Sequence, residues 1–522
     1  MGRALGRRAL NEPDSQSNAA TADLAALARG GRINFMGFVL RLAARLPFLF
    51  IAGRMYGAAA LGRFAYAILI VEFAAQLATL GLKRGLAQQL AHTDKTHSSV
   101  AWDALIVALI GSLVTIAILI AFPEAMYPNS PIAGLDRLLP ITVIALAWSD
   151  IMLAALAYRH DVGATVRARA IVEPWTISIA ALVLAFLDKR DGLIIAYVLS
   201  MVGALGASAV PFLKSYGLPR GWRPEPGTLW RMARKNIPVA AADAVEWGSR
   251  RIDIAVLGLF FAPQIVGIYY VAQQVASLPS KLKSSFDPIL GPVIAQNLRA
   301  HNKQAVARQV RQVGFWVIAA QTGVALALGI PGEGVMGLVG PNFVSGTAAL
   351  GFLLAAEVVA AMAAVSEAAL IYIASHRNMW ISLTMIALEA ALSVALIVVM
   401  RKLDLPLMWQ ATGPAIALLL SLGFAAIAKS MLLSGLLHAP VSGWRWPLVW
   451  AAAAGVIAGE AAIQLPEWAE LAFGIPIIMV VFGAVLWTRG FGPQDRELFR
   501  MSKAEIAELS LPDPSTGGDA PR

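Results

Sequence analysis

The sequence has no cysteine, and only 14% of its 522 residues are charged. The missing thiols exclude disulfides, thiolate metal sites, iron–sulfur clusters and a cysteine nucleophile. A soluble domain carries about 25% charged residues, whereas 58% of this chain is hydrophobic. This composition excludes a soluble enzyme, a disordered chain and a nucleic-acid-binding domain. The apolar residues must therefore lie in a membrane, where each crossing helix uses about 20 of them.

Long apolar runs predict an all-α integral membrane protein with about 14 transmembrane helices. We expect one six-helix bundle in residues 31–213 and a second in 237–430, joined by a linker at 214–236 that is rich in Pro, Gly and basic residues. Two additional transmembrane helices follow in 431–488. Residues 1–30 and 489–522 are then the N-terminal and C-terminal tails.

The basic residues predict the orientation of these helices. Most of the 42 lysines and arginines fall in the tails, the 214–236 linker and the other connections on that same side, and few fall in the opposite loops. Because cytoplasmic loops collect Lys and Arg, we expect both tails and the linker to be cytoplasmic. The sequence also lacks long connections on the opposite side, which excludes an external domain.

A weak internal repeat relates the two predicted bundles. An offset of 205 residues (258 minus 53) superposes Gly53 on Gly258, Gly62 on Gly267 and Arg45 on Arg250. Six crossings per half bring both repeats in from the same side, which predicts parallel repeats around an axis along the membrane normal and a substrate site between them. Coincidence is the alternative, since Gly and Ala are common here.

The usual catalytic motifs are missing. The sequence has no GxxxxGK[ST], HExxH or GxSxG, which argues against an ATPase or a hydrolase. Its six histidines show no metal-ligand spacing. We therefore expect a protein that is not an enzyme and that uses no metal and no cofactor.

Ionisable residues inside the predicted helices are the candidate functional residues, because such residues normally face a protein interior or a watery cavity. Arg41 and Arg45 lie one turn apart with no acid in their own helix, which favours a ligand-facing cavity. In the seventh predicted helix (237–260), a spacing of 3, 4 and 3 predicts one continuous polar stripe. That stripe consists of Asp243, Glu246, Arg250 and Asp253, with Arg251 about 100° round the helix.

Two interpretations of these charges stay open. The arginines Arg41, Arg45, Arg250 and Arg251 suit a phosphorylated lipid, because a guanidinium group binds phosphate through two parallel hydrogen bonds. Alternatively, Arg250 only pairs with Glu246 and Asp253 on its own helix. The acids are candidates either for counter-ions of the arginines or for binding a coupling proton or sodium ion; they are Glu72, Asp150, Glu173, Asp243, Glu246, Asp253, Glu357, Glu367 and Glu389.

Three segments carry a resemblance to a known family. Residues 251–296 contain Arg251-x-Asp253, Gly267-x-Tyr269 and Pro288, and residues 335–359 and 52–67 contain further similar stretches. In this order and spacing the chain resembles the polysaccharide-unit (O-antigen/exopolysaccharide, Wzx-like) flippases of the multidrug/oligosaccharidyl-lipid/polysaccharide exporter superfamily. The likeness covers about residues 31–430.

The resemblance implies a multi-pass flippase of the bacterial inner membrane. Such a protein moves an undecaprenyl-pyrophosphate-linked oligosaccharide to the periplasmic leaflet for surface polysaccharide synthesis, by alternating access. Its partners would be this polyprenyl-linked oligosaccharide, the lipid bilayer, and the polymerase and glycosyltransferases of the same pathway, with no nucleic acid. Arg45 and Arg250 match the family's cationic cavity by position, but Asp243 and Glu246 beside Arg250 depart from it.

Three alternatives remain. A drug or cation antiporter of the same superfamily would share the fold but should have a cavity richer in acids and aromatics. A lipid II flippase would differ only in its cargo. A membrane glycosyltransferase or polymerase is disfavoured, because such enzymes need a substantial external loop.

Overall fold

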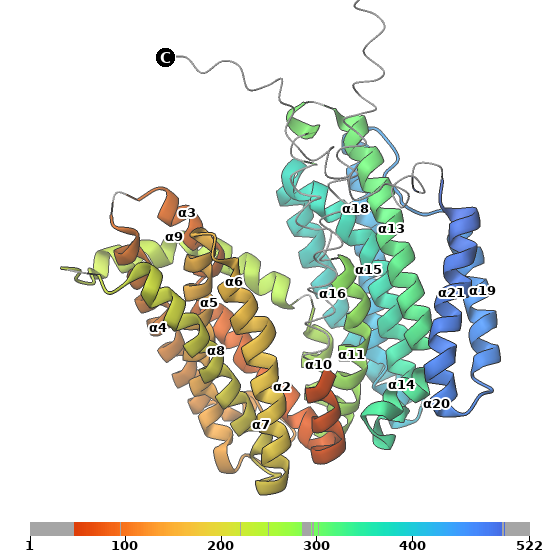
Figure 1. Ribbon diagram of the computed structural model, residues 1–522, viewed down its shortest axis with the longest axis horizontal. Helices are drawn as coiled ribbons and strands as arrows, with labels where there is room; N and C mark the ends of the chain where they lie inside the picture. The colour runs from red at the N-terminus through yellow and green to blue at the C-terminus, as the bar shows by residue number, and fades with distance from the viewer. Residues whose placement is uncertain are drawn as a thin grey trace, which may run out of the picture.

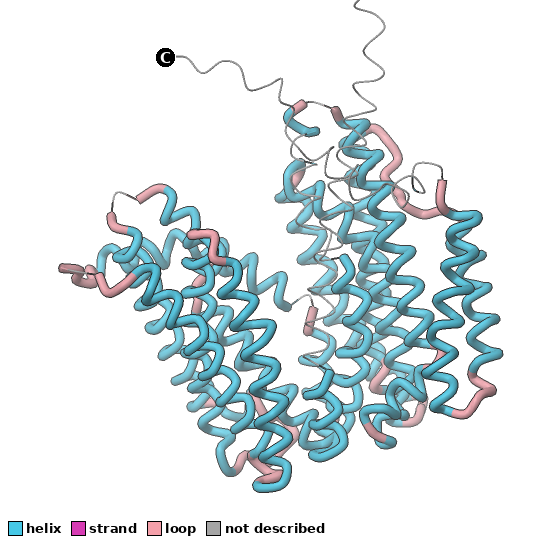
Figure 2. Tube along the Cα trace, in the orientation of Figure 1, coloured by secondary structure: helices cyan, strands magenta, loops and turns pink. Residues whose placement is uncertain are grey.

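The computed structural model describes residues 46–492 except 94, 220, 249, 284–293, 295–296 and 301, and it also describes Asp495. Within these ranges the chain forms helices and short connections, and no β-strand (Figure 2). Ten helical segments of the described chain are long and apolar enough to cross a membrane. The predicted all-α membrane fold is therefore confirmed.

The first bundle lies on the left of Figure 1 and contains the helices before residue 217. Each predicted crossing from 64 to 213 corresponds to a helix, whereas most of the crossing predicted at 33–53 lies outside the described residues. The elements are η1 (Ala52–Tyr56), α2 (Gly57–Ala78), α3 (Leu82–Ala91), α4 (His97–Ala121), η2 (Pro123–Ala125), η3 (Gly134–Ile141), α5 (Thr142–Tyr158), α6 (Val162–Thr165), η4 (Val166–Val172), α7 (Glu173–Leu187) and α8 (Gly192–Tyr216).

The second bundle and the C-terminal helix pair lie on the right of Figure 1. The elements are α10 (Ile252–Phe260), α11 (Pro263–Lys283), α13 (Lys303–Gly329), α14 (Gly332–Val339), η5 (Pro341–Gly346), α15 (Thr347–Ile373), α16 (Ser375–Lys402), α17 (Leu407–Gln410) and α18 (Gly413–Leu437), followed by α19 (Pro447–Ala462), α20 (Glu467–Ala469), η6 (Glu470–Gly474), α21 (Ile475–Val485) and η7 (Leu486–Gly490). The domain boundaries given above remain predictions.

The prediction of a single helix at 237–260 is wrong. The chain instead forms α9 (Pro226–Gly248), turns, and starts α10 at Ile252. The turn has i to i−3 bonds, from Arg250 N to Trp247 O (3.3 Å) and from Arg251 N to Gly248 O (3.0 Å). Glycine is a poor helix former, and α10 starts with Asp253 in its first turn, where the helix dipole favours an acid. The predicted polar stripe is therefore divided between two helices.

Helix α9 packs on the first bundle, although it follows the linker in sequence. It lies across that bundle in Figure 1, and its buried side includes Met232, Asn236 and Ala240. A Cβ built on Gly85 of α3 would lie 1.9 Å from Asn236 Oδ1, so only glycine allows this close approach. The bend between α9 and α10 is thus where the chain passes from one bundle to the other.

The two bundles meet at the glycines that the 205-residue offset relates. A Cβ on Gly62 would lie 1.8 Å from Pro263 O and 2.4 Å from Gly267 N, and a Cβ on Gly267 would lie 2.0 Å from Ala58 O and 2.9 Å from Gly62 N. Because 58 plus 205 is 263, these contacts are reciprocal. Reciprocal contacts of this kind are expected where a two-fold axis passes through an interface.

A second pair of contacts follows the same offset. Thr142 Oγ1 donates to Leu139 O, and Thr347 Oγ1 donates to Val344 O, both at 2.7 Å. Each threonine starts a crossing helix, α5 or α15, directly after a 3-10 turn. Equivalent residues therefore adopt equivalent local structure, which is evidence that the sequence repeat is more than coincidence.

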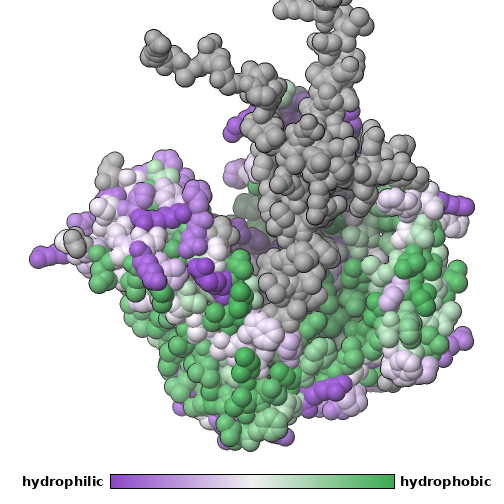
Figure 3. Space-filling model, viewed as in Figure 1, coloured by the Kyte–Doolittle hydropathy of each residue, from purple (hydrophilic) through white to green (hydrophobic). Residues whose placement is uncertain are grey.

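The bundles converge at one end of the molecule and separate at the other. We call the end with α3, α9 and the 214–236 connection the linker end, and the end with η2, η3 and η5 the loop end. At the loop end α2 lies against α11, whereas at the linker end the bundles are apart (Figure 1). The space-filling view shows a notch that is open at the linker end (Figure 3).

Candidate functional site

The candidate site lies where the turn between α9 and α10 passes between the two bundles (Figure 1). Arg250 and Arg251 occupy this turn. The sequence predicted both arginines on one continuous helix, whereas the structure has them in the turn between α9 and α10. Arg41 and Arg45 lie outside the described residues.

Arg251 is paired with an acid from the other bundle. Its Nη1 forms an ion pair with Glu72 Oε2 of α2, and its guanidinium lies 4.9 Å from the centre of the Trp247 ring. Both charged side chains are about one-third exposed (38% and 32%). This pair links the two bundles, so Glu72 acts as a counter-ion and Arg251 is not free of a partner.

Arg250 is the more available of the two arginines. Its side chain is 65% exposed, and the ion pair with Glu246 Oε1 is long, at 3.9 Å. Glu246 instead has a close contact of 2.5 Å with Arg84 Nη2 of α3, and Asp243 Oδ1 lies 3.0 Å from Arg84 Nε. The expected neutralisation of Arg250 within its own helix is therefore only partly correct, because both acids lie closer to Arg84 than Glu246 lies to Arg250.

A second charged network lies inside the first bundle. Asp150 of α5 forms ion pairs with Lys83 (3.0 Å) and with Arg169, and Arg169 also reaches Glu173 (2.7 Å). Arg169 lies in the π-helical segment η4, and such segments often occur at functional positions. Two cations thus balance two carboxylates, and Asp150 and Glu173 each lie in a close ion pair.

Asp253 and Glu389 have a different environment. Asp253 is fully buried and accepts hydrogen bonds from Tyr269 Oη (2.9 Å) and Gln273 Nε2 (2.9 and 3.0 Å). Glu389 of α16 is also fully buried, and neither of its carboxylate oxygens has a hydrogen-bond partner among the described residues. The two carboxyl groups interact electrostatically. Across the part of the chain that the structure describes, neither forms an ion pair with a cation.

The predicted pair between Arg250 and Asp253 is accordingly wrong. The turn before Ile252 places Arg250 outside α10, while Asp253 points toward Tyr269 and Gln273 of α11. A spacing of three residues puts side chains on one face only while the helix continues. Here the helix does not continue.

Sequence reasoning missed three cations of the site, Lys83, Arg84 and Arg169. Each lies near the linker end of a crossing helix, where a basic residue by itself indicates only the orientation of that helix in the membrane. A signal was present for Arg169, because it precedes Glu173 by four residues, the spacing of an ion pair on one helical face. No such signal existed for Arg84, whose partners are about 160 residues away (|i−j| = 162 for Glu246).

This arrangement of two helical bundles is similar to that of solved multidrug transporters and of a lipid II flippase, so the chain has a membrane-transporter fold. The chain belongs to the polysaccharide biosynthesis protein family, which matches residues 51–328. No curated protein sequence matches the chain significantly.

Similarity to solved structures extends over most of the chain. An inward-facing multidrug resistance MATE transporter of the MOP superfamily aligns with a TM-score of 0.61 at 16% identity, over 77% of this chain and 96% of that one. Lipid II flippase MurJ, in an inward closed conformation, aligns with a TM-score of 0.63 at 10% identity, over 89% of this chain and 100% of that one. An outward-facing MATE transporter aligns with a TM-score of 0.54 at 16% identity, over 80% of this chain and 96% of that one. These low identities establish the fold alone.

Proposed function

We propose that this protein is an inner-membrane flippase that carries an undecaprenyl-pyrophosphate-linked oligosaccharide to the periplasmic leaflet by alternating access. The observation that carries the proposal is the notch that opens at the basic linker end, in a member of the polysaccharide biosynthesis protein family. The protein would act without catalysis and without a cofactor. Surface polysaccharide synthesis would then take up the delivered units.

The linker end faces the cytoplasm in this proposal. Basic residues concentrate there, including Arg84, Arg231, Arg234 and Lys235 on α3 and α9, and cytoplasmic segments are enriched in Lys and Arg. Both termini would also be cytoplasmic.

The phosphate groups of the cargo would bind at the α9–α10 turn. Arg250 is mostly exposed and only weakly paired, so it can accept a phosphate without first breaking a close ion pair. Arg251 would have to exchange Glu72 for the ligand, and Arg41 and Arg45 remain candidates on the first helix. A guanidinium group provides two donors for each phosphate, which an ammonium group does not.

Asp253 and Glu389 are the proposed ion-coupling residues. Two buried carboxylates without a nearby cation are unfavourable as a charged pair, so a proton or a monovalent cation must reduce their charge. Binding and release of that ion would then follow the movement of the second bundle. Glu72, Asp150 and Glu173 of the first bundle are less suited to this role, because each has a close ion pair with a cation.

The proposal is tested with purified protein in proteoliposomes that contain a fluorescent undecaprenyl-pyrophosphate oligosaccharide. We expect protein-dependent exposure of the sugar on the opposite leaflet. This activity should be lost in Arg250→Ala and retained in the control Arg401→Ala, since Arg401 is an exposed residue at the C-terminal end of α16. Movement of lipid II instead would assign the lipid II flippase alternative, and efflux of a cationic dye alone would assign the antiporter. Turnover of a sugar donor would contradict the absence of catalysis.

A further inference from the structure

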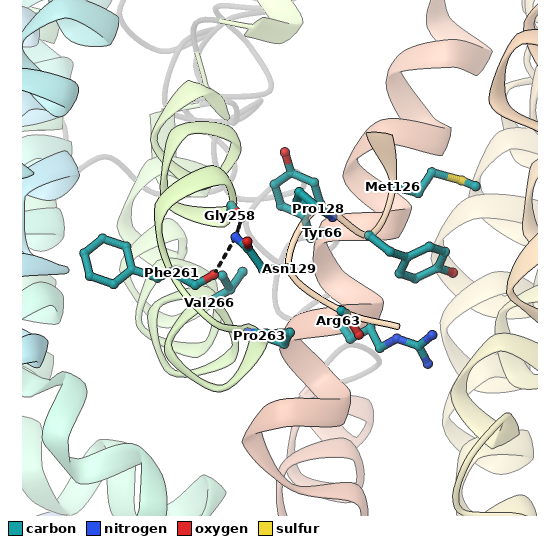
Figure 4. Close-up of a pocket in the computed structure, with 12 residues that line it drawn as sticks. Arg63, Tyr66, Met126, Pro128, Asn129, Gly258, Phe261, Pro263 and Val266 are labelled. Carbon is teal, nitrogen blue, oxygen red and sulfur yellow. Dashed lines mark hydrogen bonds between the residues drawn. The ribbon is translucent and has the colours of Figure 1, made fainter. Parts of the chain in front are cut away.

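Asn129 connects the two bundles at the loop end. It lies in the connection between α4 and η3, and its Nδ2 donates to Gly258 O (2.8 Å) and Phe261 O (3.2 Å) at the end of α10 (Figure 4). It also donates to Leu259 O (3.3 Å). The last carbonyl groups of a helix have no partner within the helix. A side chain of the first bundle thus caps a helix of the second.

Arg63 holds the segment that carries Asn129. Its Nη2 donates to Pro131 O (2.7 Å) and forms an ion pair with the fully buried Asp136, and its guanidinium lies 4.8 Å from the centre of the Tyr127 ring. Asp136 in turn accepts from Ala133 N at 2.7 Å. The connection is therefore fixed to α2, so Asn129 moves with the first bundle.

The bundles are in direct contact beside Asn129. Gly62 and Gly267 approach within backbone contact distance, and the remaining cavity, lined in part by Tyr66, Gly258 and Val266, measures only about 20 Å³ (Figure 4). Such a volume holds about one water molecule. Separation of the bundles at this end must break the three Asn129 contacts, because their donor and acceptors belong to different bundles.

We propose that Asn129 is a positioning residue that holds the loop end closed while the linker end is open. A neutral amide is suited to this role: its two N–H groups serve acceptors at the end of α10, and no charge has to be removed from water. Breaking these hydrogen bonds is part of the free energy of opening toward the loop end. Since each such bond contributes little on balance, Asn129 sets the ratio of the two states and does not determine the fold.

The natural lack of cysteine provides the test. A single Val266→Cys reporter, buried at 2% exposure beside the cavity, is labelled by a maleimide only when the loop end opens. In nanodiscs we expect Asn129→Ala to raise the labelling rate about five- to tenfold. Asn129→Asp should raise it further, because a carboxylate would face three carbonyl oxygens. Ser130→Ala, at the neighbouring position, should leave the rate unchanged.

A second reporter separates opening from general loss of stability. Ala147→Cys lies fully buried within the first bundle and should label equally slowly in all variants. If neither Asn129 variant changes labelling at Val266→Cys, the proposal is overturned. It is also overturned if both reporters become reactive together, since Asn129 would then stabilise the protein as a whole. Neither reporter requires cargo or transport, so the outcome does not depend on the flippase proposal.

Discussion

The acids of the first bundle and those at the centre of the second have opposite surroundings. Glu72, Asp150 and Glu173 each lie within ion-pair distance of an arginine or lysine. Asp253 and Glu389 are more deeply buried and, in the described ranges, have no cation beside them. The first group of acids is charge-paired within the protein, whereas no described cation compensates the carboxyl groups of the second group.

Whether an acid has a nearby cation depends on its own neighbours and not on the bundle to which it belongs. The second bundle also contains a satisfied pair, in which the buried Lys429 of α18 lies 3.1 Å from Glu367 and donates to Ser382 Oγ at 3.1 Å. Removing an ion from water costs several kcal/mol unless a partner compensates. An unpaired buried carboxyl therefore points to function more strongly than an intramembrane charge alone, and this distinction divides eight of the nine acids that the sequence treated alike, all except Glu357.

The largest effect is expected for Glu389→Gln. This change should abolish the dependence of transport on the ion gradient and lower the gradient-driven rate by about 5- to 150-fold, the range of typical coupling free energies. Membrane abundance should not fall, because an amide is easier to bury than a carboxylate. The measurement is flipping in proteoliposomes with and without a gradient, and Glu460→Gln on the exposed face of α19 is the control. An unchanged gradient response would remove Glu389 from the coupling role.

For Arg169→Gln in the first bundle, we expect a loss of stability. This change leaves Glu173 without its cation and Asp150 with Lys83 alone, so stability should fall by about 3 kcal/mol. Membrane abundance and the thermal unfolding temperature report the loss. Adding Glu173→Gln to the variant should recover much of it, since the unpaired carboxylate is then gone. Full stability of the single variant would show that the network is not structural.

A smaller effect is expected at the pair between the bundles, Arg251 with Glu72. Because both side chains are about one-third exposed, solvent screens the pair, and Glu72→Gln should destabilise the protein by only about 1–2 kcal/mol. The exchanged variant Glu72→Arg with Arg251→Glu should regain stability but not cargo binding. Recovery of transport in the exchanged variant would show that Arg251 does not contact the phosphate.

The smallest effect concerns Asp495, which lies outside the membrane. Burial raises its pKa, but hydrogen bonds from Arg445 and from the Gly492 backbone N–H outweigh burial and hold the pKa below its usual value. A depressed pKa stabilises the folded state above the ordinary aspartate pKa, and this contribution is lost as the pH falls through the folded value. Measured by thermal unfolding, the free energy of unfolding should fall by less than about 1 kcal/mol between about pH 6 and pH 3. The Asp495→Asn variant should not show this fall. The same slope in both proteins would exclude Asp495 as its source.

The crossing helices were predictable because their signal is local. A run of about 20 apolar residues needs no tertiary partner to be recognised, and twelve described helices start within about ten residues of an expected run: α2, α4, α5, α7, α8, α11, α13, α15, α16, α18, α19 and α21. The break after Gly248 was not predictable in this way. The 237–260 segment is compatible with one helix on its own, and α9 bends only because its buried side packs on α3.

The sequence by itself determined the class of protein, since composition requires a membrane and the order of short motifs indicates the polysaccharide flippases. It also determined which residues were candidates, because every intramembrane charge is visible in the chain. Only the tertiary structure decided which charges lie together: Arg251 meets Glu72 across 179 residues of sequence, while Asp253 and Glu389 have no cation within ion-pair distance among the described residues. The physical reason is that the free energy of a buried charge depends on what lies within a few ångströms of it, and those neighbours come from distant helices.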